Sequence, residues 1–242
     1  MHRTILIITL MCVQWPLAIA QQQESVIRSF AGRQVRLAIP AGYCLMGRDN
    51  PQGRLYYELQ EKGNQGINVV AAMFADCKEW KIRQEDPSHR IRRHGSYLFQ
   101  LIDGKETLAP YSRENFLQEI VTQESKDQGL GLGLGSRAYK EELSLRLNRK
   151  LKEADIPTAS SVAQINLGLV AIDGYAAFYG FGVTVNYIRE SPRINSIVAS
   201  TIVNGVPVTI NLYDDYSSGG MFGRLLNEQK RNAESLVKAN PK

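Results

Sequence analysis

Beyond His2, the chain has only two histidines, His89 and His94, to support acid–base or metal chemistry. The five-residue step between them differs from the i, i+4 step that puts two ligands on one helix face, and it fits no zinc motif. Ser136 follows a glycine, but the sequence around it lacks the G-x-S-x-G turn that exposes a hydrolase nucleophile. The sequence therefore points to no histidine-based catalytic site and no metal-binding histidine pair.

Two adjacent carboxylates, Asp214 and Asp215, follow Tyr213 at the end of the last predicted strand. Adjacent acids bind a cation when further oxygen ligands converge on them, but no calcium-loop spacing follows this pair. Acids at the end of an edge strand are usually solvated. We therefore expect surface side chains here, with no metal and no cofactor.

Glycine and leucine alternate strictly over residues 129–135. Glycine-rich loops can hold phosphate, but this one has neither the Lys-Ser/Thr ending of a P-loop nor a preceding strand. The composition favours a linker, flexible or strand-like, with Leu130, Leu132 and Leu134 packed on one side. The alternative is that these three leucines contact a partner protein.

The most basic stretch runs from residue 78 to residue 94, and its six Lys and Arg residues are Lys78, Lys81, Arg83, Arg90, Arg92 and Arg93. Such a stretch can contact acidic lipid headgroups or polyanions. Glu79, Glu85 and Asp86 interrupt it, which favours a solvated loop that leads into a strand. The formal net charge of +5 is too small to indicate a nucleic-acid partner. Peripheral contact with an anionic membrane stays open.

Residues 1–20 have the three-part layout of a cleavable signal peptide. The parts are a basic start at Arg3, an apolar run from Ile5 to Val13, and small residues at Ala18 and Ala20. Gln14 and Pro16 keep the apolar run well below the roughly 20 residues that cross a bilayer. We expect cleavage near Ala20 and a mature chain that is periplasmic or secreted.

Removal of the leader discards Cys12 and leaves two cysteines, Cys44 and Cys77. In an oxidising compartment we expect them to form a disulfide, which would stabilise the fold by about 3 to 4 kcal/mol. The alternative is a pair of buried free thiols, since cysteine packs as a small hydrophobe. Two cysteines this far apart form neither a CxxC redox motif nor a four-ligand zinc site.

The elements that must position these residues are clearest in the second half, where two turn dipeptides separate runs of β-forming residues. Asp173-Gly174 joins residues 162–172 to 175–188, and Asn204-Gly205 joins 194–203 to 206–213. Both dipeptides suit the positive φ angles of a type I′ turn. The sequence therefore predicts two hairpins that form a four-stranded antiparallel meander.

Alternation along these strands predicts one strongly apolar face and one mixed face for the meander. Such a sheet needs a helical cover, which residues 221–237 supply at helical spacing. Further strands are predicted at 34–39, 67–74 and 96–102, and helices at 52–62, 112–126 and 139–154, with Ser112 as an N-cap. The predicted fold class is α+β, a single domain over residues 21–242 with a twisted antiparallel sheet covered by helices.

Three segments resemble a family of uncharacterised exported bacterial proteins. They are I-P-x-G-Y-C at Ile39 to Cys44, F-A-D-C at Phe74 to Cys77, and V-N-G-x-P-V-x-x-N-L-Y at Val203 to Tyr213. The order of elements also resembles the PsbP-like α/β/α sandwich, whose members open with a strand ending in Pro-x-Gly and close with a helix. These resemblances imply a non-catalytic accessory or binding role, and they supply no site residues.

Together these features predict an exported, non-enzymatic binding or accessory protein of the cell envelope. We expect it to hold an envelope protein or a small ligand, without a cofactor and without nucleic acid. One alternative is an envelope-directed hydrolase whose acids and bases meet only in three dimensions, around His89 or His94. A second alternative is a protein that binds an anionic membrane surface through its basic stretch.

Overall fold

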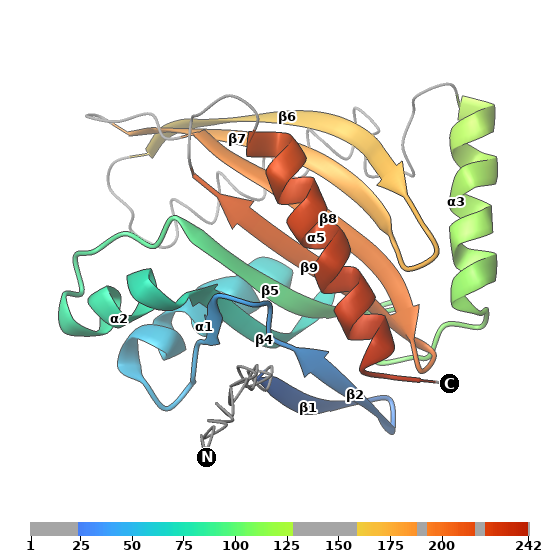
Figure 1. The fold of residues 1–242 in the computed structure, drawn as a ribbon, viewed down its shortest axis with the longest axis horizontal. Helices are drawn as coiled ribbons and strands as arrows, with labels where there is room; N and C mark the ends of the chain where they lie inside the picture. The colour runs from blue at the N-terminus through green and yellow to red at the C-terminus, as the bar shows by residue number, and fades with distance from the viewer. Residues whose placement is uncertain (1–23, 128–158, 188–192, 216–220, 242) are drawn as a thin grey trace, which may run out of the picture.

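Seven strands form one antiparallel sheet in the computed structural model, which describes residues 24–127, 159–187, 193–215 and 221–241 (Figure 1). In spatial order they are β3 (Tyr43–Leu45), β4 (Asn68–Asp76), β5 (Arg93–Gln100), β9 (Val206–Asp214), β8 (Arg193–Val203), β7 (Ala177–Tyr187) and β6 (Ala159–Ile172). A separate hairpin consists of β1 (Ser25–Phe30) and β2 (Arg33–Ala38), and the helices are α1 (Pro51–Asn64), α2 (Cys77–Glu85), α3 (Arg113–Asp127) and α5 (Met221–Lys238). The α+β class and the C-terminal meander are confirmed.

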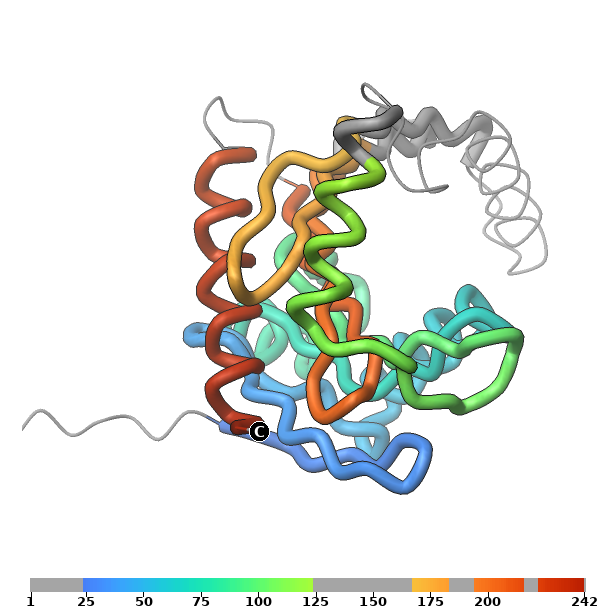
Figure 2. Tube along the Cα trace, turned by 90° about the vertical axis from the view of Figure 1, so that its right-hand side faces the viewer, coloured from blue at the N-terminus to red at the C-terminus, as the bar shows by residue number. Residues whose placement is uncertain are grey.

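Helices cover both faces of the sheet (Figures 1 and 2). The face that carries Phe178, Ala199 and Ile210 packs against α5 and the β1-β2 hairpin, and we call it the front face. The opposite back face has two smaller apolar clusters, one under α1 and α2 around Met73 and one under α3 around Tyr179. The sheet is therefore buried from two sides.

The prediction of one strongly apolar and one mixed face agrees with the structure, because the back face carries polar side chains between its two apolar clusters. The sides of the individual strands, however, do not all face the same way. In β9 the apolar side, with Ile210, faces front, whereas in β7 the apolar side, with Tyr179, faces back. Alternation within a strand shows which residues share a side, but only the register between strands shows which sides coincide. On the front side of β7, Gly180 leaves room for α5, because a Cβ there would lie 2.5 Å from the Phe222 ring.

The two predicted hairpin turns differ in the structure. Asn204 and Gly205 have φ angles of +52° and +78°, as a type I′ turn requires. Neither residue of Asp173-Gly174 has positive φ, so the type I′ prediction is wrong there. Instead the Asp173 carboxylate accepts hydrogen bonds from the backbone N–H groups of Tyr175 (2.8 Å) and Ala176 (3.1 Å), which makes a longer turn.

The helices α1, α3 and α5 confirm three of the four predicted helices, and the Ser112 hydroxyl caps α3 by accepting from Asn115 N–H at 3.2 Å. The prediction of a solvated loop from residue 78 is wrong, because residues 77–85 form α2 and bury Trp80. Strands β1 and β3 were not predicted.

The leader at 1–20, the linker at 129–135 and the helix at 139–154 lie outside the described residues. No helix in the described part of the chain is long and apolar enough to span a membrane.

Candidate functional site

A strip of uncharged polar side chains crosses the back face between its two apolar clusters. It occupies the central strands β5, β9 and β8, and we call it the polar strip. Its members are His94, Ser96, Ser196, Ser200, Thr209, Asn211 and Tyr213. Apolar side chains are the rule at the centre of a sheet covered by helices, so a polar strip at this place is a candidate binding site.

The strand register arranges the strip in rows. In the first row Tyr213 lies between His94 on β5 and Ser196 on β8. The His94 and Tyr213 rings stack, with centroids 5.0 Å apart and an interplanar angle of 20°. In the second row Asn211 Nδ2 donates a hydrogen bond of 3.2 Å to Ser96 Oγ, and both residues are buried. The second row is therefore satisfied by the protein itself.

The first row is not satisfied in this way. His94 Nδ1 and Ser196 Oγ are buried, and neither has a hydrogen-bond partner among the described residues. Ser196 as a whole is only 3% exposed. A buried polar atom without a partner costs about 1 to 3 kcal/mol, so two of them in one row indicate a place that a bound molecule can complete.

The titratable members of the strip are neutral at neutral pH. Burial, with a smaller contribution from the charge of Arg90, lowers the pKa of His94 to about 4. Burial raises the pKa of Tyr213 to about 12. The neutral imidazole has one donor and one acceptor nitrogen, and the phenol keeps its proton. The strip thus offers hydrogen bonds without charge.

An ion cluster centred on Arg93 occupies the front face at the same end of the sheet. The guanidinium lies 2.9 Å from Glu228 on α5, 3.5 Å from Asp76 and 3.6 Å from Asp214. It also donates a hydrogen bond of 3.0 Å to the Tyr43 hydroxyl. Burial is the largest cause that raises the Tyr43 pKa above its usual value, and Glu228 adds to it. With Tyr43 included, the cluster joins the ends of four strands, β3, β4, β5 and β9, to α5.

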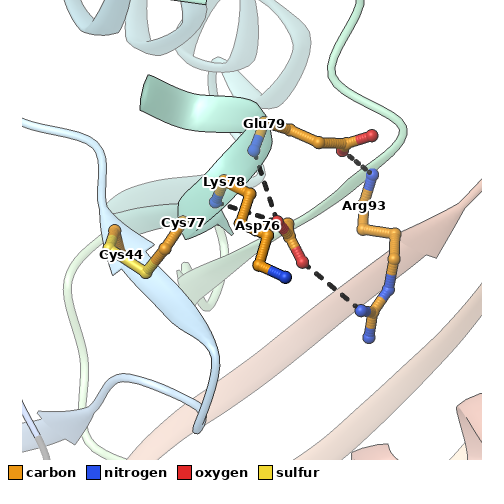
Figure 3. The surroundings of a disulfide bond; sticks show 6 residues. All are labelled: Cys44, Asp76, Cys77, Lys78, Glu79 and Arg93. Carbon is orange, nitrogen blue, oxygen red and sulfur yellow. Dashed lines mark hydrogen bonds and ion pairs between the residues drawn. A yellow bond between two sulfur atoms is a disulfide. The ribbon is translucent and has the colours of Figure 1, made fainter. Parts of the chain in front are cut away.

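The predicted disulfide between Cys44 and Cys77 is present, with a sequence separation of 33 residues (Figure 3). Cys44 lies within β3, and Cys77 is the first residue of α2, directly after β4. Asp76 caps α2 by accepting from Lys78 and Glu79 N–H groups at 3.0 and 3.3 Å. Since Asp76 also pairs with Arg93, the disulfide directly adjoins the Arg93 cluster (Figure 3).

The six basic residues of the stretch from residue 78 to residue 94 differ in their exposure and in their contacts. Lys78 and Lys81 are exposed on α2. Arg93 holds the ion cluster, and the other three positions bond locally: Arg83 donates to the His89 carbonyl (2.9 Å), Arg90 pairs with Asp215 (2.8 Å), and the Arg92 backbone N–H donates to Glu79 (2.9 Å). Their contact with anionic surfaces stays a prediction.

The sequence predicted that Asp214 and Asp215, at the end of β9, are both solvated, and this prediction is wrong for Asp214. Asp214 is 2% exposed and faces Arg93, while Asp215 pairs with Arg90. Within the described ranges, no group of three or more His, Cys, Asp or Glu side chains is placed to hold a metal ion. Ser136 and the leucines Leu130, Leu132 and Leu134 lie outside the described residues.

Sequence reasoning missed the polar strip, although β9 gave a signal in the alternation of Thr209, Asn211 and Tyr213 with apolar residues. The strip forms only when β5 pairs with β9, and these strands are distant in the sequence. In comparisons with known proteins, no family model matches the chain and no curated protein matches it significantly. The functional conclusion therefore depends on the polar strip and the disulfide.

Proposed function

We propose that the protein is an exported, non-enzymatic binding or accessory protein of the cell envelope, and that the polar strip is its binding site. The observation that carries the proposal is the first row of the strip, where His94 Nδ1 and Ser196 Oγ are buried without a partner in the described part of the chain. Binding sites commonly combine apolar walls with a few convergent polar groups. The clusters under α1–α2 and under α3 supply such walls.

Two features support export to an oxidising compartment. The Cys44–Cys77 disulfide belongs to the type of bond that persists in the periplasm or outside the cell and is rare in the cytosol. The leader pattern at residues 1–20 suits removal by a signal peptidase. Both features together support a periplasmic or secreted location.

The arrangement in the strip favours binding over hydrolysis. A general base must lie within hydrogen-bond reach of the nucleophile whose proton it takes. Ser196 Oγ and His94 Nδ1 share no hydrogen bond, and the low pKa of His94 makes it a weak base at neutral pH. The hydrolase alternative therefore has less support than the binding role.

The test uses the full chain with a C-terminal tag in its native host. Cells are crosslinked and fractionated, the protein is captured, and its N-terminus, cysteine state and bound molecules are determined by mass spectrometry. We expect an envelope fraction, an N-terminus near Gln21, an intact disulfide, and a stoichiometric envelope protein or small-molecule adduct. A cytosolic protein with two free thiols and nothing bound would contradict the proposal.

A further inference from the structure

We infer that the polar strip binds a neutral, hydroxyl-rich molecule of the sugar or polyol class. This inference rests on the proposed binding function and adds the chemical class of the ligand. It depends on three properties of the strip, which are its lack of charge, the type of hydrogen bond it offers, and the aromatic side chains beside its unpartnered serine.

Among the described residues, the charged side chains nearest this end of the sheet are paired or face the other way. Arg93 and Asp214 belong to the front face, where they form the ion cluster. Arg90 forms an ion pair of 2.8 Å with Asp215, which is the first residue after β9. A charged ligand on the strip would lose hydration without gaining a counter-charge, and this loss is unfavourable. The strip therefore selects for an uncharged ligand.

The hydrogen-bonding groups of the strip are mostly hydroxyls. Ser196, Ser200 and Thr209 each carry a group that donates one hydrogen bond and accepts others, and His94 adds a neutral imidazole. Ligand hydroxyls match such groups in either direction. An apolar ligand would leave Ser196 Oγ and His94 Nδ1 buried and unsatisfied, which opposes binding.

Aromatic side chains flank the unpartnered serine. The register places Ser196 between Tyr213 on β9 and Phe181 on β7, one strand away on each side. Since neighbouring strands lie about 4.8 Å apart, the two aromatic positions are roughly 10 Å from each other. A small residue between two aromatic ones suits a ring whose C–H faces pack on the aromatic side chains while its hydroxyls reach the serine.

The experiment measures binding by calorimetry and by the shift in Tm. The neutral probes are glucose, N-acetylglucosamine, trehalose and mannitol, the charged probes are gluconate, glucosamine and glucose 6-phosphate, and octanol is the apolar probe. The variants are Ser196→Ala and His94→Phe, each of which removes one unpartnered atom and keeps the packing. Ser29→Ala, at an exposed position of β1 on the other side of the sheet, is the control. We expect at least one neutral probe to bind the wild type and the control, and each strip variant to weaken it about threefold to tenfold.

Other results would overturn the inference and separate it from the proposed function. If only a charged probe or octanol binds, and Ser196→Ala weakens it, the strip is a binding site but the ligand class is wrong. If no probe binds while the crosslinked protein captures an envelope protein, the accessory role stands and the sugar inference fails. If no probe binds and nothing is captured, both fail. Neutral-probe binding that neither variant weakens also refutes the inference.

Discussion

Removal of the Cys44–Cys77 disulfide gives the most quantitative test of the fold. The bond closes a loop with a sequence separation of 33 residues. The chain-entropy relation then gives a loss of about 12 cal/mol/K, which is about 4 kcal/mol at 25 °C. For a protein of this size we expect the Cys44→Ala/Cys77→Ala variant to lose about 8 to 15 °C in Tm.

The assay is reversible urea unfolding followed by circular dichroism, with and without dithiothreitol. With an m-value of about 2.5 kcal/mol/M, the midpoint should fall by roughly 1.5 M in the double variant. Dithiothreitol should lower the wild-type midpoint by a similar amount and leave the variant unchanged, which makes the variant its own control for reductant effects. Alkylation of the native oxidised wild type should modify neither Cys44 nor Cys77.

A loss below about 1 kcal/mol would refute the reasoning, because it would mean that the bond is strained or that the unfolded chain already keeps this loop closed. A midpoint for the reduced wild type well above that of the double variant would show a packing contribution of the sulfur atoms instead. Two reactive thiols in the native oxidised protein would refute the disulfide itself.

Three further predictions concern the ion cluster, the strip and the α5 contact. Arg93→Gln removes the cation that Glu228 and Asp214 share, so we expect a loss of about 3 kcal/mol in urea unfolding, against at most about 0.5 kcal/mol for Arg33→Gln at an exposed position of β2. The folded-state pKa of His94, about 4, lies below its unfolded value. The free energy of unfolding should therefore keep its full value above about pH 6.5 and fall by on the order of 3 kcal/mol as the pH drops to 4. His94→Phe should flatten this pH dependence, and an unchanged acid slope would show that other groups cause it. Gly180→Ala places a methyl group 2.5 Å from the Phe222 ring, and we expect a loss of about 1 to 3 kcal/mol in the same assay; an unchanged midpoint would show that α5 shifts freely.

Local patterns in the sequence were enough to predict most of the helices and the meander. The Asn204-Gly205 turn and the Ser112 cap act over a few residues, so their effect can be inferred without the fold. The same kind of local signal also precedes α2. Asp76 followed by Glu79 three residues later has the spacing of a capping box, and Asp76 does accept from the backbone of α2.

The polar strip was beyond local reasoning. Its rows need His94 and Ser96 on β5 to meet Tyr213 and Asn211 on β9, more than one hundred positions later. Hydrophobic alternation predicts the sides of each strand but not the register that joins strands from the two halves of the chain. The same limit explains why Asp214 was expected in solvent when it faces Arg93.

The pairing of β5 with β9 also governs the order in which the chain can complete its sheet. The strands β3, β4 and β5 are available early during synthesis, and the disulfide between β3 and α2 needs only this part of the chain. The edge of β5 stays unpaired until β9 has been synthesised. Arg93 likewise lacks Asp214, and then Glu228 on the final helix, until those residues have been synthesised. An unpaired strand edge can pair with strands of other molecules. A nascent chain interrupted before residue 206 would therefore expose an aggregation-prone edge on β5, a strand that lies in the middle of the complete sheet.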